Sequence, residues 1–254
     1  MMIAQPEILC CPLAAIDDEL LAAYRLLLNT DEQQRLAGYR SSSAAKEFLA
    51  GRALLRIALS QRLQCEPTSL VFARDADGKP HLSFPENSGW HFNLSHDRNW
   101  AVLIIGSAGP VGIDVEGHER RNNLPAIARR FFSAAENRAL DTCDQTQWQN
   151  YFFAIWTLKE AHAKARGCGL SKILSCSSIT LDWPAEKIHF ELHDIARSDL
   201  PLSGWLYRLE ESVSLAAIAN GAASIAEPSV SRVVPLRSSE PLSLTALAQG
   251  SWQP

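Results

Sequence analysis

The spacing of apolar residues divides the chain into alternating helical and extended segments. Apolar side chains recur every three or four positions in residues 44–63 and again in 148–166, which predicts two long helices. Short apolar runs bounded by Gly, Pro, Asp and Asn predict strands. We expect strands near 70–73, 81–84, 100–105, 111–116, 179–181, 189–192, 204–209 and 213–218, and shorter helices near 17–28, 124–132 and 134–140.

The same kinds of element occur in two rounds along the chain. A long helix set against a small antiparallel sheet, repeated once, predicts an α+β fold in two subdomains, which we expect at residues 1–109 and 110–226. The remaining residues, 227–254, are rich in Ser, Pro and Leu and match no motif. We expect them to form a tail that wraps the body or is partly disordered.

Charge and composition narrow the possible classes of function. The chain has 254 residues, a net charge of -4 and a pI near 6.0. Nucleic-acid backbones are bound by clustered positive charge, so this balance argues against nucleic acid as the main partner. The apolar runs are too short to span a bilayer, the N-terminus lacks a signal-peptide pattern, and the six cysteines form no C-x-x-C pair. We therefore expect a cytoplasmic protein with reduced cysteines and no membrane partner.

The strand expected at 111–116 ends in two carboxylates. Residues two apart in a strand share one face, so Asp114 and Glu116 converge on one point, and two carboxylates held that way favour a hard cation. On the second long helix, residues four apart are neighbours, so Glu160 and Lys164 project together beside Lys159. A third carboxylate next to ammonium groups suits a Mg2+-bound pyrophosphate or phosphate ester.

Each of these patterns also has a plainer interpretation. A D-x-E pattern is often a solvated strand edge, and Glu160 with Lys164 is a common helix ion pair that contributes only a few tenths of a kcal/mol. The context favours a site, because Asp114 and Glu116 end an apolar run in which unbalanced carboxylates carry a desolvation cost.

A polar cluster lies upstream, in the run H-F-N-L-S-H at 91–96. We expect an extended segment that breaks at residues 93–96, so that an amide, a hydroxyl and an imidazole are presented together. Such a turn could hold a phosphate. An ordinary loop, with His96 as a structural histidine and Asn93 as a turn former, is the alternative.

Six short motifs occur in one order along the chain. They are F-L-A-G-R-A-L-L-R at 48–56, D-G-K-P at 77–80, F-N-L-S-H at 92–96, V-G-I-D-V-E at 111–116, F-F-S-A-A-E at 131–136 and W-T-L-K-E-A-H-A-K-A-R-G-C-G-L at 156–170. Over about residues 35–218, their order and spacing resemble those of Sfp-type 4'-phosphopantetheinyl transferases. The resemblance implies a monomer with two similar subdomains related by a pseudo-twofold axis, and coenzyme A in the cleft between them.

The resemblance also implies a reaction. A serine hydroxyl of an apo acyl or peptidyl carrier protein would attack the β-phosphate of coenzyme A and release 3',5'-ADP. Asp114, Glu116 and Glu160 would hold Mg2+ across the pyrophosphate. Glu160 or a bound water would take the serine proton, and Lys164, with Lys159, would stabilise the leaving group. The expected catalytic residues are therefore Asp114, Glu160 and Lys164.

The nucleotide of coenzyme A would have its own set of contacts under this resemblance. The adenine 3'-phosphate and nucleotide are expected against Arg35, Arg74, Lys79, Ser95 and His96. The loop that holds Arg74 and the turn at 93–96 could grip one phosphate from two sides. One position departs from the family pattern, because many relatives carry a basic residue where this chain has Glu47.

Two other classes of function share part of the pattern. A Mg2+-dependent phosphohydrolase or nuclease also uses D-x-E with a later Glu and Lys, although the acidic balance disfavours nucleic acid. A non-catalytic carrier-protein binding module would keep the fold without needing the metal ligands. All three candidate ligands are present, which favours an enzyme.

Overall fold

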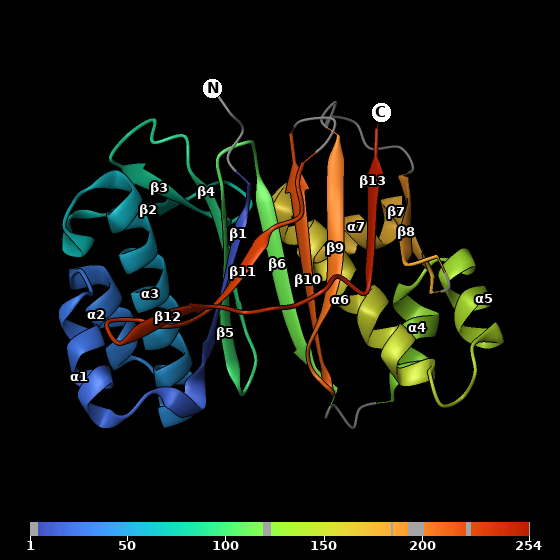
Figure 1. Ribbon diagram of the computed structural model, residues 1–254, viewed down its shortest axis with the longest axis horizontal. Coiled ribbons are helices and arrows are strands. Elements are labelled where there is room, and N and C mark those ends of the chain that lie inside the picture. The colour runs from blue at the N-terminus through green and yellow to red at the C-terminus, as the bar shows by residue number, and fades with distance from the viewer. Residues whose placement is uncertain (1–4, 119–122, 184, 193–200, 222–224, 254) are drawn as a thin grey trace.

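The computed structural model describes residues 5–118, 123–183, 185–192, 201–221 and 225–253. Two sheets lie side by side at the centre, with α1–α3 on one outer side and α4–α7 on the other (Figure 1). The predicted α+β class is confirmed. In the described part of the chain, none of the helices has the length and apolar character needed to cross a membrane.

The N-terminal half packs one long helix against a five-stranded sheet. α3 (Ser42–Leu63) contacts β1 (Glu7–Pro12), β4 (His91–His96) and β5 (Trp100–Gly106). The strand order is β12-β11-β1-β5-β4. This half also contains two short 3-10 helices (Leu13–Ala15 and Pro67–Ser69), α1 (Asp18–Leu26), α2 (Thr30–Ala37) and a separate hairpin of β2 (Val71–Arg74) and β3 (Pro80–Phe84).

The C-terminal half places its long helix across a six-stranded sheet. α6 (Trp148–Arg166) has the predicted bounds and contacts β6 (Val111–Gly117), β9 (Leu202–Glu210) and β10 (Val213–Asn220). The strand order is β6-β10-β9-β13-β8-β7. The other elements are α4 (Leu124–Phe131), α5 (Ala134–Thr142), α7 (Leu170–Cys176), β7 (Ser177–Asp182) and β8 (Lys187–Leu192).

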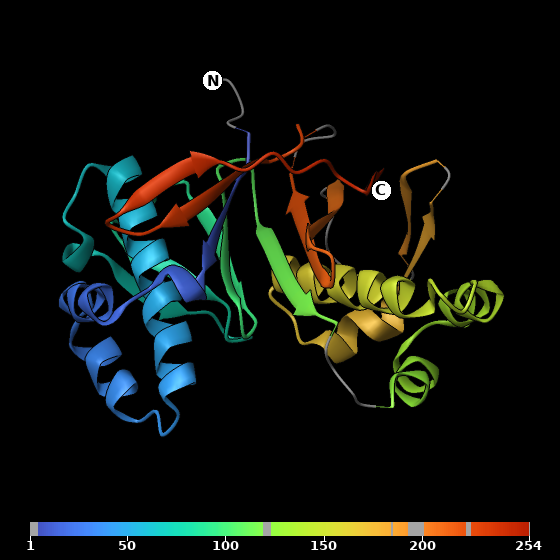
Figure 2. The ribbon, with the colours of Figure 1, turned by 60° about the horizontal axis from the view of Figure 1, so that its bottom comes forward.

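The C-terminal tail is built into both sheets. β11 (Ser229–Val234) pairs in parallel with β1, and β12 (Ser238–Pro241) pairs with β11. β13 (Ala248–Trp252) then inserts between β9 and β8, antiparallel to the first and parallel to the second. Figure 2 shows this tail running from the N-terminal helices to the C-terminal sheet. Of the two alternatives expected for residues 227–254, the described residues 227–253 follow the first, because they wrap the body as strands of both sheets. Neither sheet is purely antiparallel. The proposed subdomain boundaries stay a prediction.

One expected break in the chain is also wrong. The segment predicted to turn at residues 93–96 is a continuous strand, β4, which pairs with β5 from His91 to His96. The turn comes one residue later, where the Asp97 carboxylate accepts the backbone N–H groups of Asn99 and Trp100. Ser95 and His96 therefore point to opposite faces of a strand.

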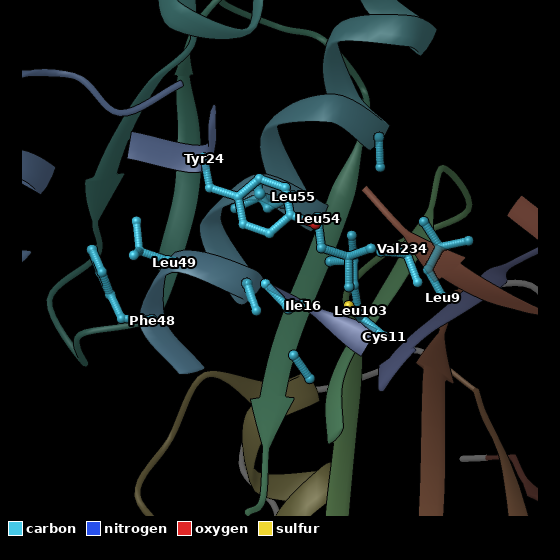
Figure 3. Packing of buried hydrophobic residues seen from close by; sticks show 14 of the residues in the cluster. Leu9, Cys11, Ile16, Tyr24, Phe48, Leu49, Leu54, Leu55, Leu103 and Val234 are labelled. Carbon is cyan, nitrogen blue, oxygen red and sulfur yellow. The ribbon is translucent and has the colours of Figure 1, made fainter. Parts of the chain in front are cut away.

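Three hydrophobic clusters hold the fold together. In the first, Leu54 and Leu55 of α3 pack near Tyr24, with Leu103 of β5 and Val234 of the tail alongside (Figure 3). The second packs α6 against the face of the C-terminal sheet. The third joins strands of the two sheets and includes Ile8, Ile104, Ile113 and Leu215. The edges of the two sheets therefore meet over a buried apolar core, and this meeting positions the site.

Candidate active site

A cavity of about 1300 Å³ lies between β4 of the N-terminal half and β6 and α6 of the C-terminal half. It contains six of the residues singled out from the sequence: Ser95, His96, Asp114, Glu116, Glu160 and Lys164. These residues come from three separate elements, and the fold brings them to one cleft. Their functional roles remain predictions.

Asp114 is the centre of this cleft. It lies on β6 and is only 4% exposed. Its Oδ1 atom accepts from Lys164 Nζ at 2.6 Å and from Ser95 Oγ at 2.9 Å, and Lys164 Nζ also donates to Ser95 Oγ at 2.9 Å. A carboxylate, an ammonium and a hydroxyl from three elements are thus in mutual contact, and the buried negative charge has a positive partner.

A glycine allows α6 to approach β6 this closely. A Cβ atom on Gly112 would lie 2.1 Å from the Ala161 carbonyl oxygen and 2.3 Å from the Ala165 amide nitrogen. Both are backbone atoms of α6, so a side chain at this position would force the helix away from the strand. Since Glu160 and Lys164 lie on α6, Gly112 sets how near they come to Asp114.

The Glu116 carboxylate accepts a hydrogen bond from a tryptophan side chain. The indole Nε1–H of Trp156 donates to Glu116 Oε1 at 3.1 Å. Trp156 is therefore more than a core aromatic, because its polar edge orients a carboxylate of the cleft.

The donor set suits a divalent cation that also binds phosphate. Among the described residues, Asp114 Oδ2 is buried and has no hydrogen-bond partner, although Oδ1 of the same carboxylate has two. Such an oxygen carries a desolvation cost that a cation would offset. No three acidic, histidine or cysteine side chains in the described ranges form a closed metal cluster. Mg2+ does not require one, since it is commonly bound by one or two carboxylates together with substrate phosphates and water.

His96 faces an acid on α3 of the same N-terminal half. Its Nδ1 atom lies 3.2 Å from Glu47 Oε2, and Glu47 Oε1 accepts from Ser43 Oγ at 2.9 Å. The position that departs from the family pattern therefore contacts one of the residues expected to bind the nucleotide. The imidazole is 54% exposed and remains open to a ligand.

Three residues expected to bind the nucleotide do not line this cavity. Arg35 stacks over Phe48, with its guanidinium carbon 5.2 Å from the ring centroid. Arg74 is exposed and donates to the Gly78 carbonyl at 2.8 Å within its own loop. Neither arginine lines the cavity that His96 borders.

Lys79 lies at the opposite end of β6 from the acidic residues. Its ammonium donates to the carbonyl oxygens of Val111 at 3.2 Å and Ala165 at 2.8 Å. Burial lowers the pKa of Lys79 to about 8, with Asp75 and Cys168 acting in the opposite direction. The residue lines a smaller cavity of about 290 Å³ beside the end of α6. In this structure it ties the D-G-K-P loop to the C-terminal half.

The structure corrects the prediction that Lys159 lies beside the leaving group together with Lys164. It is fully buried, with Nζ 2.8 Å from Glu136 Oε1 and 2.8 Å from the Ser177 carbonyl oxygen. A side chain enclosed in this way does not reach the cleft. The sequence carried a signal for this, because Lys159 follows the buried Ile155 by four residues and lies about 140° around the helix from Lys164.

The sequence interpretation missed two turns that form part of the cavity wall. The turn between β4 and β5 contributes Asp97, Arg98 and Asn99, and the turn between β9 and β10 contributes Ser212. The D-R-N run has the composition of a tight turn, which would have been a signal for a loop at this point.

Comparison with known families agrees with the motifs. The family model described as "4'-phosphopantetheinyl transferase superfamily" matches residues 110–216. The model described as "4'-phosphopantetheinyl transferase, N-terminal" matches residues 14–107. Together the two matches include all the residues that line the large cleft.

Three curated relatives carry the same family description. The chain is 37% identical to the 4'-phosphopantetheinyl transferase HetI of Nostoc sp. over 58% of its own length and 62% of the relative's. For a 4'-phosphopantetheinyl transferase of Bacillus subtilis the identity is 31% over 66% and 71%. For Sfp of Bacillus subtilis strain 168 it is 28% over 72% and 78%. The chain therefore belongs to the 4'-phosphopantetheinyl transferase superfamily, as its motifs predicted.

Proposed function

We propose that this enzyme transfers the 4'-phosphopantetheine group of coenzyme A to a serine hydroxyl of an apo carrier protein and releases 3',5'-ADP. The observation that carries the proposal is the contact of Asp114 with Lys164 and Ser95 in a cleft that Glu116 and Glu160 also line. Family membership supports the type of reaction, and the geometry of the cleft supports the roles proposed for these residues.

The chemical step is a substitution at phosphorus. The serine Oγ forms a bond to the β-phosphorus of coenzyme A, and the bond from that phosphorus to the bridging oxygen of the pyrophosphate breaks. The electron pair of this bond leaves with 3',5'-ADP. The serine proton passes to Glu160 or to a water next to it. Catalysis of such a step depends mainly on positioning and on charge stabilisation, because few covalent steps are required of the protein.

Mg2+ is proposed to bind in this cleft among three carboxylates, with direct bonds to one or two of them and with phosphate oxygens and water as its other ligands. Asp114 would offer its unpartnered Oδ2, with Glu116 and Glu160 as the further acidic groups on the same cavity. Mg2+, when bound, would neutralise charge on the pyrophosphate. The Trp156 indole would keep Glu116 turned toward the cleft through its hydrogen bond.

Lys164 is proposed to stabilise the leaving phosphate. Its side chain is 29% exposed, so the ammonium contacts Asp114 and still borders the open cavity. Negative charge that develops on the leaving oxygen would draw this ammonium toward the substrate, where it is worth more than in the resting ion pair. Ser95 would retain its hydrogen bond to Asp114 during this shift.

The proposal extends to the setting of the enzyme. We propose a monomer that acts in the cytoplasm on carrier proteins. The described cysteine side chains, at positions 10, 11, 65, 143 and 168, are free thiols, which fits a reducing compartment.

The test combines the purified protein with coenzyme A, Mg2+ and several apo carrier proteins. We expect mass spectrometry to show a phosphopantetheine addition on the carrier, with 3',5'-ADP released in equal amount. A carrier protein with the acceptor serine changed to alanine should show neither product. Cleavage of coenzyme A without modification of any carrier would favour a phosphohydrolase. Carrier binding without cleavage would favour the binding module.

A further inference from the structure

The two sheets meet at their edges without sharing a ladder of hydrogen bonds. β4 ends the five-stranded sheet and β6 ends the six-stranded sheet, and these two edge strands lie in contact. β6 pairs with β10 on its other side only. Its open edge therefore presents backbone groups that need partners from elsewhere, because buried backbone groups are costly to leave unpaired.

Side chains from the N-terminal half supply partners for this edge. The Asn93 amide oxygen accepts the Ile113 backbone N–H at 2.9 Å, and Lys79 donates to the Val111 carbonyl as described above. Asn93 is only 8% exposed, so its hydrogen bond lies inside the junction. This contact fixes β4 against β6 one residue before Asp114.

Asn93 and Ser95 form hydrogen bonds with neighbouring residues of β6. They are two residues apart on β4 and therefore share one face of that strand. Asn93 holds the backbone of Ile113, and Ser95 donates to the carboxylate of Asp114. With Ser95 and Lys164 both on Oδ1, the carboxylate is turned so that Oδ2 is left without a partner among the described residues.

We infer that Asn93 is a positioning residue for the reaction. By holding Ile113, it keeps Ser95 against Asp114 and so sets the direction in which Asp114 presents Oδ2 to a divalent cation. The inference rests on the proposed function for its link to turnover. Its link to the cation can be measured without turnover.

A purely structural role for Asn93 makes a different prediction. Loss of a buried hydrogen bond would then lower the melting temperature and leave the dependence on Mg2+ unchanged. Positioning predicts a change in that dependence, since partners that orient metal-binding carboxylates typically change metal affinity or activity about 10- to 100-fold when removed.

The experiment compares two variants with a matched control. Asn93→Leu keeps the size of the side chain and removes the acceptor, whereas Asn93→Asp keeps an acceptor oxygen for the Ile113 N–H. Asn220→Leu is the control, because Asn220 is also a buried asparagine, at 5% exposure, on the strand β10 next to β6, and does not line the cleft. Isothermal titration calorimetry of coenzyme A binding with and without Mg2+ measures the contribution of the cation to binding, and kcat measures turnover.

We expect Asn93→Leu to weaken the Mg2+-dependent part of coenzyme A binding about tenfold or more, and to lower kcat by a similar factor. Asn93→Asp should recover most of both, and Asn220→Leu should lower only the melting temperature. Combining Asn93→Leu with Ser95→Ala should cost less than the sum of the two, because both act through Asp114.

Three results would overturn the inference. The first is an Asn93→Leu enzyme with unchanged Mg2+ dependence, the second is an Asn93→Asp enzyme that behaves like Asn93→Leu, and the third is an additive double variant. A wild-type protein that binds coenzyme A with Mg2+ but modifies no carrier would refute the proposed function. In that case the titrations alone still decide the role of Asn93.

Discussion

The Lys164 ammonium lies 2.6 Å from Asp114 Oδ1, across the interface between α6 and β6. This contact admits two interpretations, a catalytic ammonium at the cleft or a partly exposed ion pair that stabilises the fold. Because the Asp114 carboxylate is buried, loss of the ammonium is expected to lower stability under both interpretations, so turnover is the measurement that separates them.

Lys164→Ala is expected to lower kcat far more than it weakens coenzyme A binding. The reason is that the ammonium is most valuable when charge builds on the leaving phosphate. Lys159→Ala on the same helix is the matched comparison, because it breaks a fully buried ion pair with Glu136 and should destabilise the protein by about 3–5 kcal/mol. Measuring kcat, coenzyme A affinity and melting temperature on both variants checks this. Normal turnover in Lys164→Ala would return the residue to a structural role.

Removing the proposed cation ligands should abolish transfer without unfolding the protein. Asp114→Ala and Glu160→Ala are expected to lose activity, since each removes a carboxylate from the cleft. Glu116→Ala should be milder, because a water can replace one oxygen ligand of Mg2+. Transfer rates measured over a series of Mg2+ concentrations, with circular dichroism as the folding control, test the assignment. Full activity in either of the first two variants would contradict it.

His96 and Arg74 should differ in their effect on the nucleotide. His96 lines the cleft, whereas the Arg74 guanidinium is occupied by the Gly78 carbonyl in an exposed loop. His96→Ala is therefore expected to raise the KM for coenzyme A by roughly ten- to hundredfold, the value of a charged hydrogen bond to phosphate, and Arg74→Ala by less. The same measurements with 3'-dephospho-coenzyme A show whether the 3'-phosphate is the group bound. Equal losses with both substrates would exclude that phosphate as the contact.

Gly112→Ala should damage both stability and turnover. The added Cβ would meet backbone atoms of α6 at 2.1 and 2.3 Å, so the helix must move and carry Glu160 and Lys164 with it. Gly78→Ala is a useful control for turnover, because open space surrounds that position and its cost comes from a positive φ of 87°. We expect a lower melting temperature in both variants and a large fall in kcat only in Gly112→Ala.

His162 should make the protein sensitive to acid. Burial, and then the positive charges of Arg166 and Lys159, lower the pKa of His162 to about 3, and neither ring nitrogen has a hydrogen-bond partner within the described residues. The unfolded chain binds the proton near pH 6.5 while the folded chain does not, so stability is lost as pH falls from about 6.5 toward 3. At pH 5 the penalty is about 2 kcal/mol.

His162→Phe is expected to remove this penalty. Urea unfolding should show the variant to be stabilised more at pH 5 than at pH 8, because wild-type His162 is neutral in both states at the higher pH. A stability difference that does not change between the two pH values would mean that His162 does not titrate in this window.

Some features followed from the sequence because they depend on local periodicity. The bounds of α6 were predicted from its apolar spacing, and the helix ends at Gly167, which adopts the left-handed conformation with a φ of 65°. Asp114 and Glu116 share one face of a strand, and Glu160 and Lys164 share one face of a helix. Each of these relationships follows from the geometry of a single element. The motifs that contain these residues identified the family.

Other features were decided only when elements packed together. Periodicity shows which residues share a face of their own element, but it does not show what lies opposite that face. Lys159 and Lys164 lie on one helix, yet only the packing of α5 and β7 encloses the first in a buried pair and leaves the second on the cleft. The tail strands likewise depend on partners far away in sequence, since β11 pairs with β1 and β13 with β9. Asn93 gains its role only because the edges of two sheets meet at Ile113.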